Sequence, residues 1–379
     1  MISQALLDSV ACPVCLEPGG CALCARPGGD HRACGEYRDR VRCRCGGPDK
    51  PRLSARDGAL VCPCCGVAYR MRAEEGRLEL LPVDGLGDQT RYADPEFQER
   101  LHLGEGPPLL SARVKSDLMR EMLAAEPGER LLDLGCGGGR LAAYATRDAV
   151  HVTGIDVAAS FGHEAARKVD LVLGDLRRLP FRKGSFSGAY CLDVLEHLDE
   201  EGVREVLTEA RRALSASGRL LVYTHAMESS RLASFQRGVN RLARRLGRLG
   251  LLDQERERLR KSDHLNPFSS HEHFAALCAE VGFEVVARRY YNVVFKAVVE
   301  DLLLRIYEQW RRRSSKAPAR QAQSDRADDD GWRRPGRFGL GVALVLTWLL
   351  KLDVVLFGGI RTGPFFGLLR PNAARGEQP

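Results

Sequence analysis

The chain has 379 residues, a formal net charge of +7 and 44% hydrophobic residues. This length suggests two or three domains of roughly 150 residues. The hydrophobic content is enough for a buried core, which excludes a chain that is disordered throughout. The mild positive charge is compatible with nucleic acid or an anionic membrane, but it indicates neither by itself.

Cysteines are concentrated at the start of the chain: ten of the 13 lie between Cys12 and Cys65. The first ten residues contain Asp8 and no long apolar run, unlike a secretory signal. We therefore expect a reducing, cytoplasmic environment, in which clustered cysteines are typical zinc ligands. Two Cys-x₂-Cys pairs predict one zinc site, and a second set predicts another: Cys12, Cys15, Cys62 and Cys65; then Cys21, Cys24, Cys43 and Cys45. An iron–sulfur cluster is the alternative.

Composition divides the chain into segments. Residues 1–84 form a cysteine-rich unit with few aliphatic residues, which would need metal to fold. Residues 85–111, rich in glycine and proline, are interpreted as a linker. From residue 112 onward, helical patterns alternate with short apolar runs typical of strands. Helices are predicted near 112–126, 139–147, 199–215 and 270–281, and strands near 130–134, 151–155, 170–173, 187–192, 219–225, 283–291 and 363–369.

This alternation predicts an α/β fold with a doubly wound, mostly parallel, seven-stranded sheet. Ligands in such folds bind at the carboxyl ends of the strands. The core is expected over 112–300, interrupted at 229–262 by an amphipathic insertion that could cover the site. Arginines fill one face of this insertion, and no acidic residue occurs from Arg231 to Gly250. Residues 301–360 are expected to hold a disordered stretch and an apolar helix, and 361–372 the last strand.

A glycine-rich loop follows the first strand of the core, in Asp133-Leu134-Gly135-Cys136-Gly137-Gly138-Gly139. Glycines there allow a tight turn and a close approach of backbone to ligand. Arg140 stands where a dinucleotide site would have another glycine, so a nicotinamide cofactor fits poorly. Asp133 precedes the loop, Asp156 ends the second strand and Asp175 follows the third. Three acids in these places predict recognition of an amino group, two ribose hydroxyls and an adenine amine.

With these acids, the loop resembles the first motif of class I S-adenosylmethionine (SAM) methyltransferases. Leu179-Pro180-Phe181 and Asp193-Val194-Leu195-Glu196-His197-Leu198 resemble later motifs of the branch that contains the ubiquinone and menaquinone biosynthesis enzymes. The resemblance implies a methyltransferase fold, SAM as cofactor and methyl transfer to a small-molecule or lipid-like acceptor. It also implies the cofactor-binding residues: Asp133, Gly135, Cys136, Gly137, Gly139, Asp156, Val157, Asp175, Leu176 and Asp193.

Methyl transfer from a sulfonium is a direct displacement, so a general base is optional. The candidates for a catalytic base are His197, His225 and His264, which follow the fourth strand, the fifth strand and the insertion. A structural role for each histidine is the alternative. Cys191 is interpreted as a core residue rather than a nucleophile.

The frame around Cys12 and Cys62 resembles small zinc-ribbon proteins that activate RNA and protein methyltransferases. That likeness favours a second hypothesis, an rRNA or tRNA methyltransferase whose zinc module docks RNA. A non-catalytic SAM-binding scaffold is a third, although such a scaffold has no need of the intact loop and acids. The oligomeric state is not indicated.

Residues 338–360 are strongly apolar, broken by Lys351 and Asp353. A membrane span needs about 20 nearly uncharged residues, so this segment is borderline. We expect a helix buried against the sheet, with a peripheral membrane contact as the alternative.

Overall fold

The structure, a computed structural model, describes residues 2–13, 52–56, 58–63, 66–81, 92, 107–158, 160–228, 232–252, 264–265, 268–291, 294–306 and 337–372. The predicted disordered stretch at 311–337 therefore lies almost entirely outside the described residues, as do most of the predicted linker and the central part of the cysteine-rich segment.

The described strands form one sheet with the order β1-β2-β3-β4-β7-β6-β5-β8-β9-β11-β10. The last seven in this order are the predicted core strands. β7, β6, β5, β8 and β9 pair in parallel, whereas β11 runs antiparallel to both of its neighbours, β9 and β10. Their bounds are β5 Arg130–Leu134, β6 His151–Asp156, β7 Asp170–Leu173, β8 Phe186–Leu192, β9 Leu214–His225, β10 Phe283–Tyr290 and β11 Pro364–Pro371.

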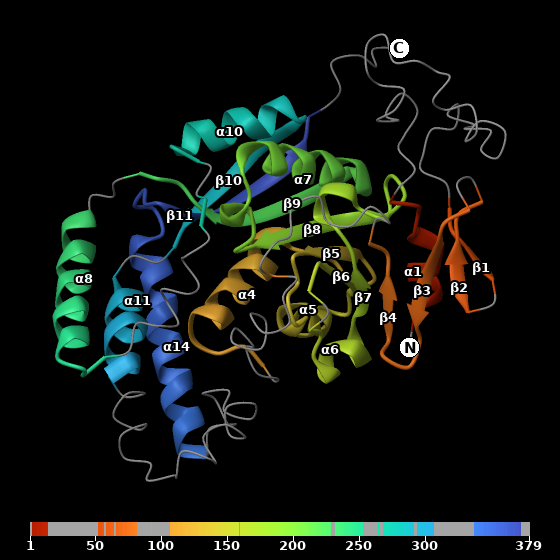
Figure 1. The fold of residues 1–379 in the computed structure, drawn as a ribbon. Helices are drawn as coiled ribbons and strands as arrows, with labels where there is room; N and C mark the ends of the chain where they lie inside the picture. Colours follow the sequence, from red (N-terminus) through yellow and green to blue (C-terminus); the bar gives the residue numbers. More distant parts are fainter. Residues whose placement is uncertain are drawn as a thin grey trace.

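Helices cover both faces of this sheet, as a doubly wound fold requires (Figure 1). One apolar cluster unites the sheet with α7 (Glu200–Ala213) and α10 (His271–Glu280). A second cluster, on the opposite face, unites it with α4, α5, α6 and the apolar helix α14. These helices span Leu110–Leu123, Arg140–Ala145, His163–Lys168 and Arg337–Phe357. The predicted fold class is therefore confirmed for the core.

One boundary differs from the sequence-based expectation. The sequence predicts a turn at Ser217–Gly218 before a strand at 219–225. In the structure α7 ends at Ala213 and β9 already begins at Leu214. The pairing of β9 with β8 then jumps from Leu214, opposite Phe186, to Arg219, opposite Gly188. The four β9 residues between Leu214 and Arg219 stand opposite one residue of β8, so this part of β9 is a bulge-like irregularity within a continuous strand rather than a turn before it.

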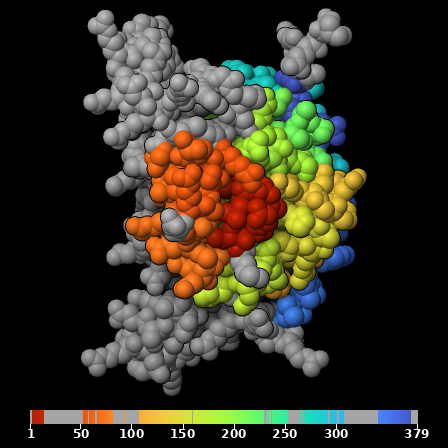
Figure 2. All heavy atoms as spheres, turned by 90° about the vertical axis from the view of Figure 1, so that its right-hand side faces the viewer, coloured from red at the N-terminus to blue at the C-terminus, as the bar shows by residue number. Residues whose placement is uncertain are grey.

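The amino-terminal strands extend the same sheet. β1 (Ser54–Arg56), β2 (Ala59–Val61), β3 (Ala68–Arg72) and β4 (Arg77–Glu79) pair antiparallel in succession, and β4 then pairs in parallel with β7. The short helix α1 (Gln4–Ser9) lies among these strands and the core, as Figure 2 shows. Leu6, Leu60 and Leu78 belong to the same buried cluster as Leu132 of the core. The described part of residues 1–84 thus shares one core with the domain that follows.

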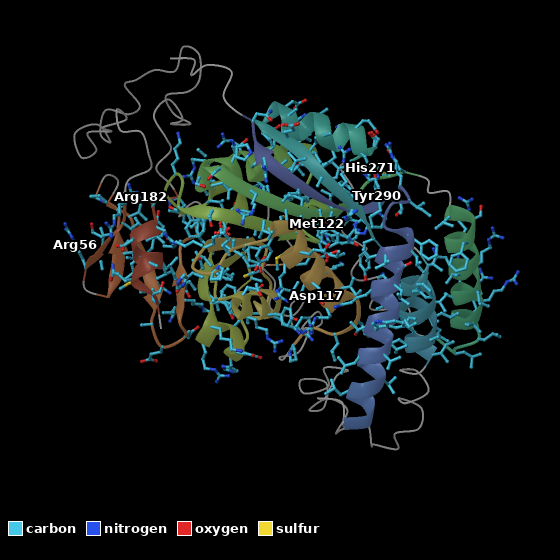
Figure 3. The ribbon with its side chains drawn as sticks, turned by 180° about the vertical axis from the view of Figure 1, so that it is seen from behind. Arg56, Asp117, Met122, Arg182, His271 and Tyr290 are labelled. Carbon is cyan, nitrogen blue, oxygen red and sulfur yellow. The ribbon has the colours of Figure 1, made fainter. Side chains whose placement is uncertain are left out.

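Three helical segments lie side by side on the α4 side of the sheet: α8 (Ala233–Arg248), α11 (Phe295–Val298), which continues as the π-helical η5 (Val299–Leu304), and α14 (Figure 1). Polar contacts fasten α14 to the core. Lys351 pairs with Asp117 of α4, which Figure 3 labels, at an N–O distance of 2.6 Å, and the buried Asp353 accepts a hydrogen bond of 3.0 Å from the backbone of Val294.

Candidate cofactor and acceptor site

The glycine loop turns at the carboxyl end of β5 and leads into α5. The backbone nitrogens of Gly135 and Cys136 both donate to the carbonyl of Ile155 on β6, at 2.9 and 3.1 Å. This pair of bonds holds the loop against the neighbouring strand. The loop therefore has a fixed shape before any ligand arrives.

The glycines of the loop serve different purposes. Gly135, Gly137 and Gly139 have φ angles of 79°, 52° and 76°, which favour glycine. A Cβ at Gly135 would lie 2.4 Å from Val194, and one at Gly139 would lie 2.6 Å from Ala165, so these two allow close packing. A Cβ at Gly137 would meet no atom within 4 Å. The open space beside Gly137 is where a ligand can approach the backbone.

Asp156, at the end of β6, reaches across to the loop. Its Oδ2 accepts a hydrogen bond of 2.7 Å from Gly137 N, and its Oδ1 accepts one of 2.9 Å from Ala158 N. Burial raises the pKa of this carboxyl, whereas the backbone donors lower it in part. A partly exposed carboxylate fixed next to an open loop fits the predicted contact with ribose hydroxyls.

Asp133 is buried beneath the loop, with 4% of its surface exposed. Burial raises its pKa to about 8; Tyr190 on β8 counteracts this effect, and the charge of Asp156 adds to it. A positive charge close to two neighbouring carboxyls with raised pKa values would favour their ionised forms. SAM carries an ammonium and a sulfonium, so its charge fits this chemistry.

The other predicted cofactor residues lie along the same edge. Val157 is partly exposed directly after β6, and Leu176 begins the short helix η3 (Leu176–Arg178). Asp175 caps that helix through Arg177 N at 2.9 Å and pairs with the Arg177 guanidinium at 3.1 Å. Its contact with an adenine stays a prediction, since the cap and the ion pair already explain an acid here.

Two further predicted cofactor residues, Cys136 in the glycine loop and Asp193 after β8, make contacts that the sequence does not predict. The Cys136 side chain packs toward β6, where a Cβ on Gly154 would lie 2.8 Å from its sulfur, and burial raises the pKa of its thiol. Asp193, after β8, has a positive φ of 57°. Its carboxylate pairs with Lys115 of α4, a residue to which the sequence analysis gave no role.

The three predicted histidines come together at this edge. The rings of His197 and His264 have centroids 4.7 Å apart, and those of His225 and His264 are 6.2 Å apart. Glu196 lies among them, buried to 1% exposure, with its Oε1 3.5 Å from His225 Nδ1. The Tyr92 hydroxyl lies 3.1 Å from His197 Nε2. Among the described residues, Glu196, His197 and His264 are the group whose ligand atoms could hold one metal ion.

Only two of the predicted zinc ligands are described. Cys12 and Cys62 are both buried in the same cluster, and the Cys12 sulfur lies 3.2 Å from the Tyr69 hydroxyl. The others lie outside the described residues: Cys15, Cys21, Cys24, Cys43, Cys45 and Cys65.

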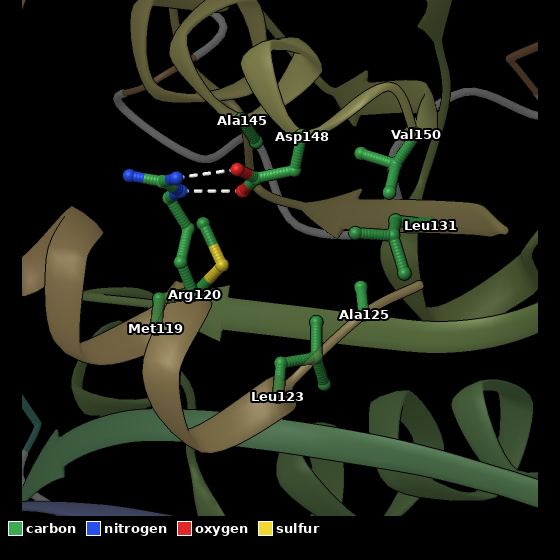
Figure 4. A pocket seen from close by; sticks show the side chains of 8 residues that line it. All are labelled: Met119, Arg120, Leu123, Ala125, Leu131, Ala145, Asp148 and Val150. Atoms are coloured by element: carbon green, nitrogen blue, oxygen red, sulfur yellow. Dashed lines mark hydrogen bonds and ion pairs between the residues drawn. The ribbon is translucent and has the colours of Figure 1, made fainter. Parts of the chain in front are cut away.

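A small pocket opens at the opposite edge of the sheet, near the amino ends of β5 and β6 (Figure 4). Apolar side chains line most of it, and Arg120 and Asp148 form an ion pair across its mouth. It contains none of the predicted site residues, and its position at the amino ends of the strands is not where ligands bind in this fold.

Comparison with protein families and known proteins agrees with this geometry. Residues 132–222 match the family model described as "Methyltransferase domain". This part of the chain is a methyltransferase domain. The match contains the glycine loop, Asp133, Asp156, Asp175, Asp193 and one of the three clustered histidines, His197, but it stops before His225 and His264.

Two relatives named as methyltransferases illustrate the range of acceptors around this domain. An O-methyltransferase, rstn1, of Aspergillus nomiae is 37% identical over 141 residues, covering 35% of this chain and 59% of the relative. A 24-methylenesterol C-methyltransferase of rice is 27% identical over 186 residues, covering 46% and 47%. An uncharacterized protein of a Streptomyces fradiae transposon is 36% identical over 121 residues, covering 30% and 34%. The matched regions thus cover 34–59% of the length of these relatives.

Solved structures are more distantly similar. The [4+2]-cyclase SpnF is 19% identical, with a TM-score of 0.42 over 70% of this chain and 82% of that one. Phosphoethanolamine N-methyltransferase 2 of Haemonchus contortus is 16% identical, with a TM-score of 0.42 over 76% and 59%.

Proposed function

We propose that this protein transfers the methyl group of SAM to an oxygen or carbon of a small-molecule or lipid-like acceptor. The observation that carries the proposal is the Gly137–Asp156 pair: an open glycine backbone bonded at 2.7 Å to a carboxylate at the end of the next strand. The methyltransferase domain match and the names of the relatives support the same activity.

Within this proposal each part of the edge has a separate task. Gly135, Cys136, Gly137 and Gly139 hold the loop around the cofactor, with Val157 and Leu176 beside its adenosine. Asp156 accepts the ribose hydroxyls, Asp175 faces the adenine amine, and Asp133 balances the positive charges. Asp193, paired with Lys115, lies beside the cofactor. SAM supplies an electrophilic methyl group, and the protein supplies orientation, which can contribute about 7–11 kcal/mol to such a displacement.

The acceptor is proposed to lie between the cofactor edge and the insertion. His197, His225 and His264 face this space from η4, β9 and the segment after α8. A histidine there can accept the proton of an acceptor hydroxyl, in line with the sequence-based prediction. The relatives include both O- and C-methyltransferases, and the histidine group favours an oxygen acceptor.

A peripheral membrane contact is part of the proposal. In the described part of the chain, Leu340–Phe357 is long and apolar enough by length and composition to cross a membrane, and 22% of it is buried. Its buried stripe carries Thr347 and Asp353, which bind the core, whereas Val345, Trp348 and Val355 are 60%, 59% and 78% exposed. A helix fastened on one side and apolar on the other suits insertion into a membrane surface rather than a span.

The neighbouring helix α8 adds positive charge to this side of the molecule. All five of its arginines are exposed: Arg237, Arg241, Arg244, Arg245 and Arg248. Anionic lipid headgroups attract such a row.

We also propose that the amino-terminal segment binds zinc, first through Cys12, Cys15, Cys62 and Cys65. The burial of Cys12 and Cys62 in one cluster, and the turn in which Gly66 N donates to Cys62 O at 3.0 Å, fit a zinc knuckle.

Calorimetric titration with SAM and with its demethylated product tests the central proposal. We expect micromolar binding to the native protein and none to Asp156→Ala, with an unchanged zinc content in that variant. Acceptor screens with labelled methyl then compare phenols, lipids and RNA. Binding to RNA with a steep salt dependence would favour an RNA acceptor instead, and no SAM binding by the native protein would contradict the enzyme function.

A further inference from the structure

A carboxylate and two imidazoles meet beside the cofactor edge. The ligand atoms of Glu196, His197 and His264 all lie within 4.8 Å of one another. Glu196 and His197 come from η4 (Leu195–His197), directly after β8, while His264 lies 67 positions further along the chain. A backbone hydrogen bond of 2.8 Å from Leu265 N to Glu196 O brings the two segments together.

Glu196 is the unusual member of this group. Its surface is 1% exposed, and among the described residues its carboxylate contacts a hydroxyl and a histidine: Thr224 Oγ1 at 3.3 Å and His225 Nδ1 at 3.5 Å. In the described part of the chain, no lysine or arginine forms an ion pair with it. A buried carboxylate is costly without a cation. The site therefore calls for positive charge close to the Glu196 oxygens.

The surroundings of the histidines support a fixed arrangement. His225 Nδ1 is buried without a hydrogen-bond partner in the described structure. Tyr92 packs edge-on against the His197 ring, with centroids 5.0 Å apart, and its hydroxyl reaches the ring nitrogens. Contacts of this kind hold the ring of a metal-bound histidine in place. His197 and His264 are partly exposed, so the group is open on the side of the acceptor space.

We propose that Glu196, His197 and His264 bind one divalent transition-metal ion, with an open position for the oxygen of the acceptor. Two imidazoles and one carboxylate are the ligand set of several catalytic zinc and iron sites, whereas magnesium prefers oxygen ligands alone. The ion neutralises the Glu196 charge. This inference rests on the proposed methyltransferase function and narrows its acceptor to a hydroxyl compound.

Metal binding would lower the pKa of the acceptor hydroxyl, as it does for bound water. The hydroxyl proton is released to water. The acceptor oxygen then forms a bond to the methyl carbon, the carbon–sulfur bond breaks, and its electron pair returns to sulfur. The products are a methyl ether and the neutral demethylated cofactor.

Manganese is a suitable probe, because it prefers nitrogen and oxygen ligands to the thiolates of the amino-terminal segment. Chelator-treated protein is reloaded with no more zinc than the predicted cysteine sites hold, so that zinc does not fill the proposed site. It is then titrated with MnCl₂ by electron paramagnetic resonance. We expect one site, weakened at least about tenfold in His264→Ala and in His197→Ala. The matched control is His151→Ala, because His151 is exposed at the amino end of β6, on the opposite edge.

SAM affinity is measured on the same samples, so that a failure of the metal-site proposal can be told from a failure of the methyltransferase proposal. Native SAM binding in His264→Ala, together with weaker manganese binding, supports the metal site. Manganese binding that is equal in all variants, or absent from the native protein, overturns it even if SAM binds. If SAM does not bind the native protein, the methyltransferase proposal fails, while the manganese titration still decides the metal site. Glu196→Gln adds a variant that keeps the shape of the side chain and removes its charge.

Discussion

Lys115 and Asp193 form an ion pair between α4 and the loop after β8. The Lys115 ammonium lies 2.7 and 2.5 Å from the two Asp193 oxygens, and 4.1 Å above the Tyr223 ring. The Lys115 side chain is 12% exposed and that of Asp193 is 32% exposed. The pair thus fixes a residue with positive φ at the edge where the cofactor is proposed to bind.

Lys115→Met should destabilise the protein by about 1–2 kcal/mol, because it leaves a half-buried carboxylate without its cation. In the double variant Lys115→Met with Asp193→Asn no lone charge remains, so part of the loss should be recovered. Urea denaturation of both single variants and the double variant measures the coupling. Strictly additive effects would show that the ion pair contributes nothing to stability.

SAM affinity should rise with pH between about 6 and 8. Burial holds the pKa of Asp133 at about 8 in the ligand-free protein, so the carboxyl is largely protonated at pH 6. A cationic ligand favours the ionised form, so binding at low pH must release a proton, and this cost disappears as pH rises through 8.

Calorimetry in buffers of different ionisation enthalpy measures that proton directly. The amino group of SAM also titrates near this range, so the comparison is between the native protein and Asp133→Asn. The native protein should release more protons per bound SAM than Asp133→Asn at pH 6, and this difference in proton release should fall as pH rises. Equal proton release by the two proteins at every pH would mean that Asp133 is ionised throughout.

Gly137→Ala should weaken SAM binding at least about tenfold. The substitution places a methyl group in the open space beside the loop and forces alanine to adopt a φ of 52°. The conformation itself costs about 1–2 kcal/mol. Gly184→Ala is the matched control: its φ is 69°, it too has no atom within 4 Å of the added Cβ, and it lies in the turn before β8.

Both variants should lose similar stability in thermal denaturation, but only Gly137→Ala should lose SAM affinity. Equal SAM binding by the two would place the cofactor elsewhere.

Trp348→Glu should reduce binding to phosphatidylglycerol vesicles without destabilising the fold, because Trp348 is 59% exposed on the apolar face of α14. Flotation of native and variant protein measures the effect. Leu350 lies in the buried stripe of the same helix. Leu350→Ala should therefore lower the free energy of unfolding by about 2–5 kcal/mol and leave vesicle binding intact. Concentration-dependent dimerisation that Trp348→Glu abolishes would identify a second copy of the chain as the partner instead.

Much of the core was accessible from the sequence, because strand periodicity and the glycine loop are local signals. The bounds of β5 and β7 coincide with the predicted 130–134 and 170–173. The histidines were recognised one at a time by their positions after strands, but their meeting with Glu196 depends on the Leu265–Glu196 hydrogen bond, which no local pattern encodes.

Other features escaped prediction for similar reasons. Glu196 stands next to His197 in a recognisable motif, yet only its burial reveals that its charge needs a partner. Lys115 lies in an ordinary helix 78 positions from Asp193, and nothing in the sequence connects the two. The extension of the sheet by β1–β4 was missed because short strands between cysteines carry little hydrophobic pattern.

The parallel pairing of β4 with β7 has a consequence for how this chain can be divided. Without β4, β7 would become a bare edge with unsatisfied backbone groups, and such edges invite aggregation. A fragment that begins at residue 85 would lose this cover along with Leu6, Leu60 and Leu78 from the shared cluster. The cysteine-rich segment is therefore a structural flank of the core sheet. Under the proposal that this segment binds zinc, metal starvation should lower the solubility of the entire polypeptide.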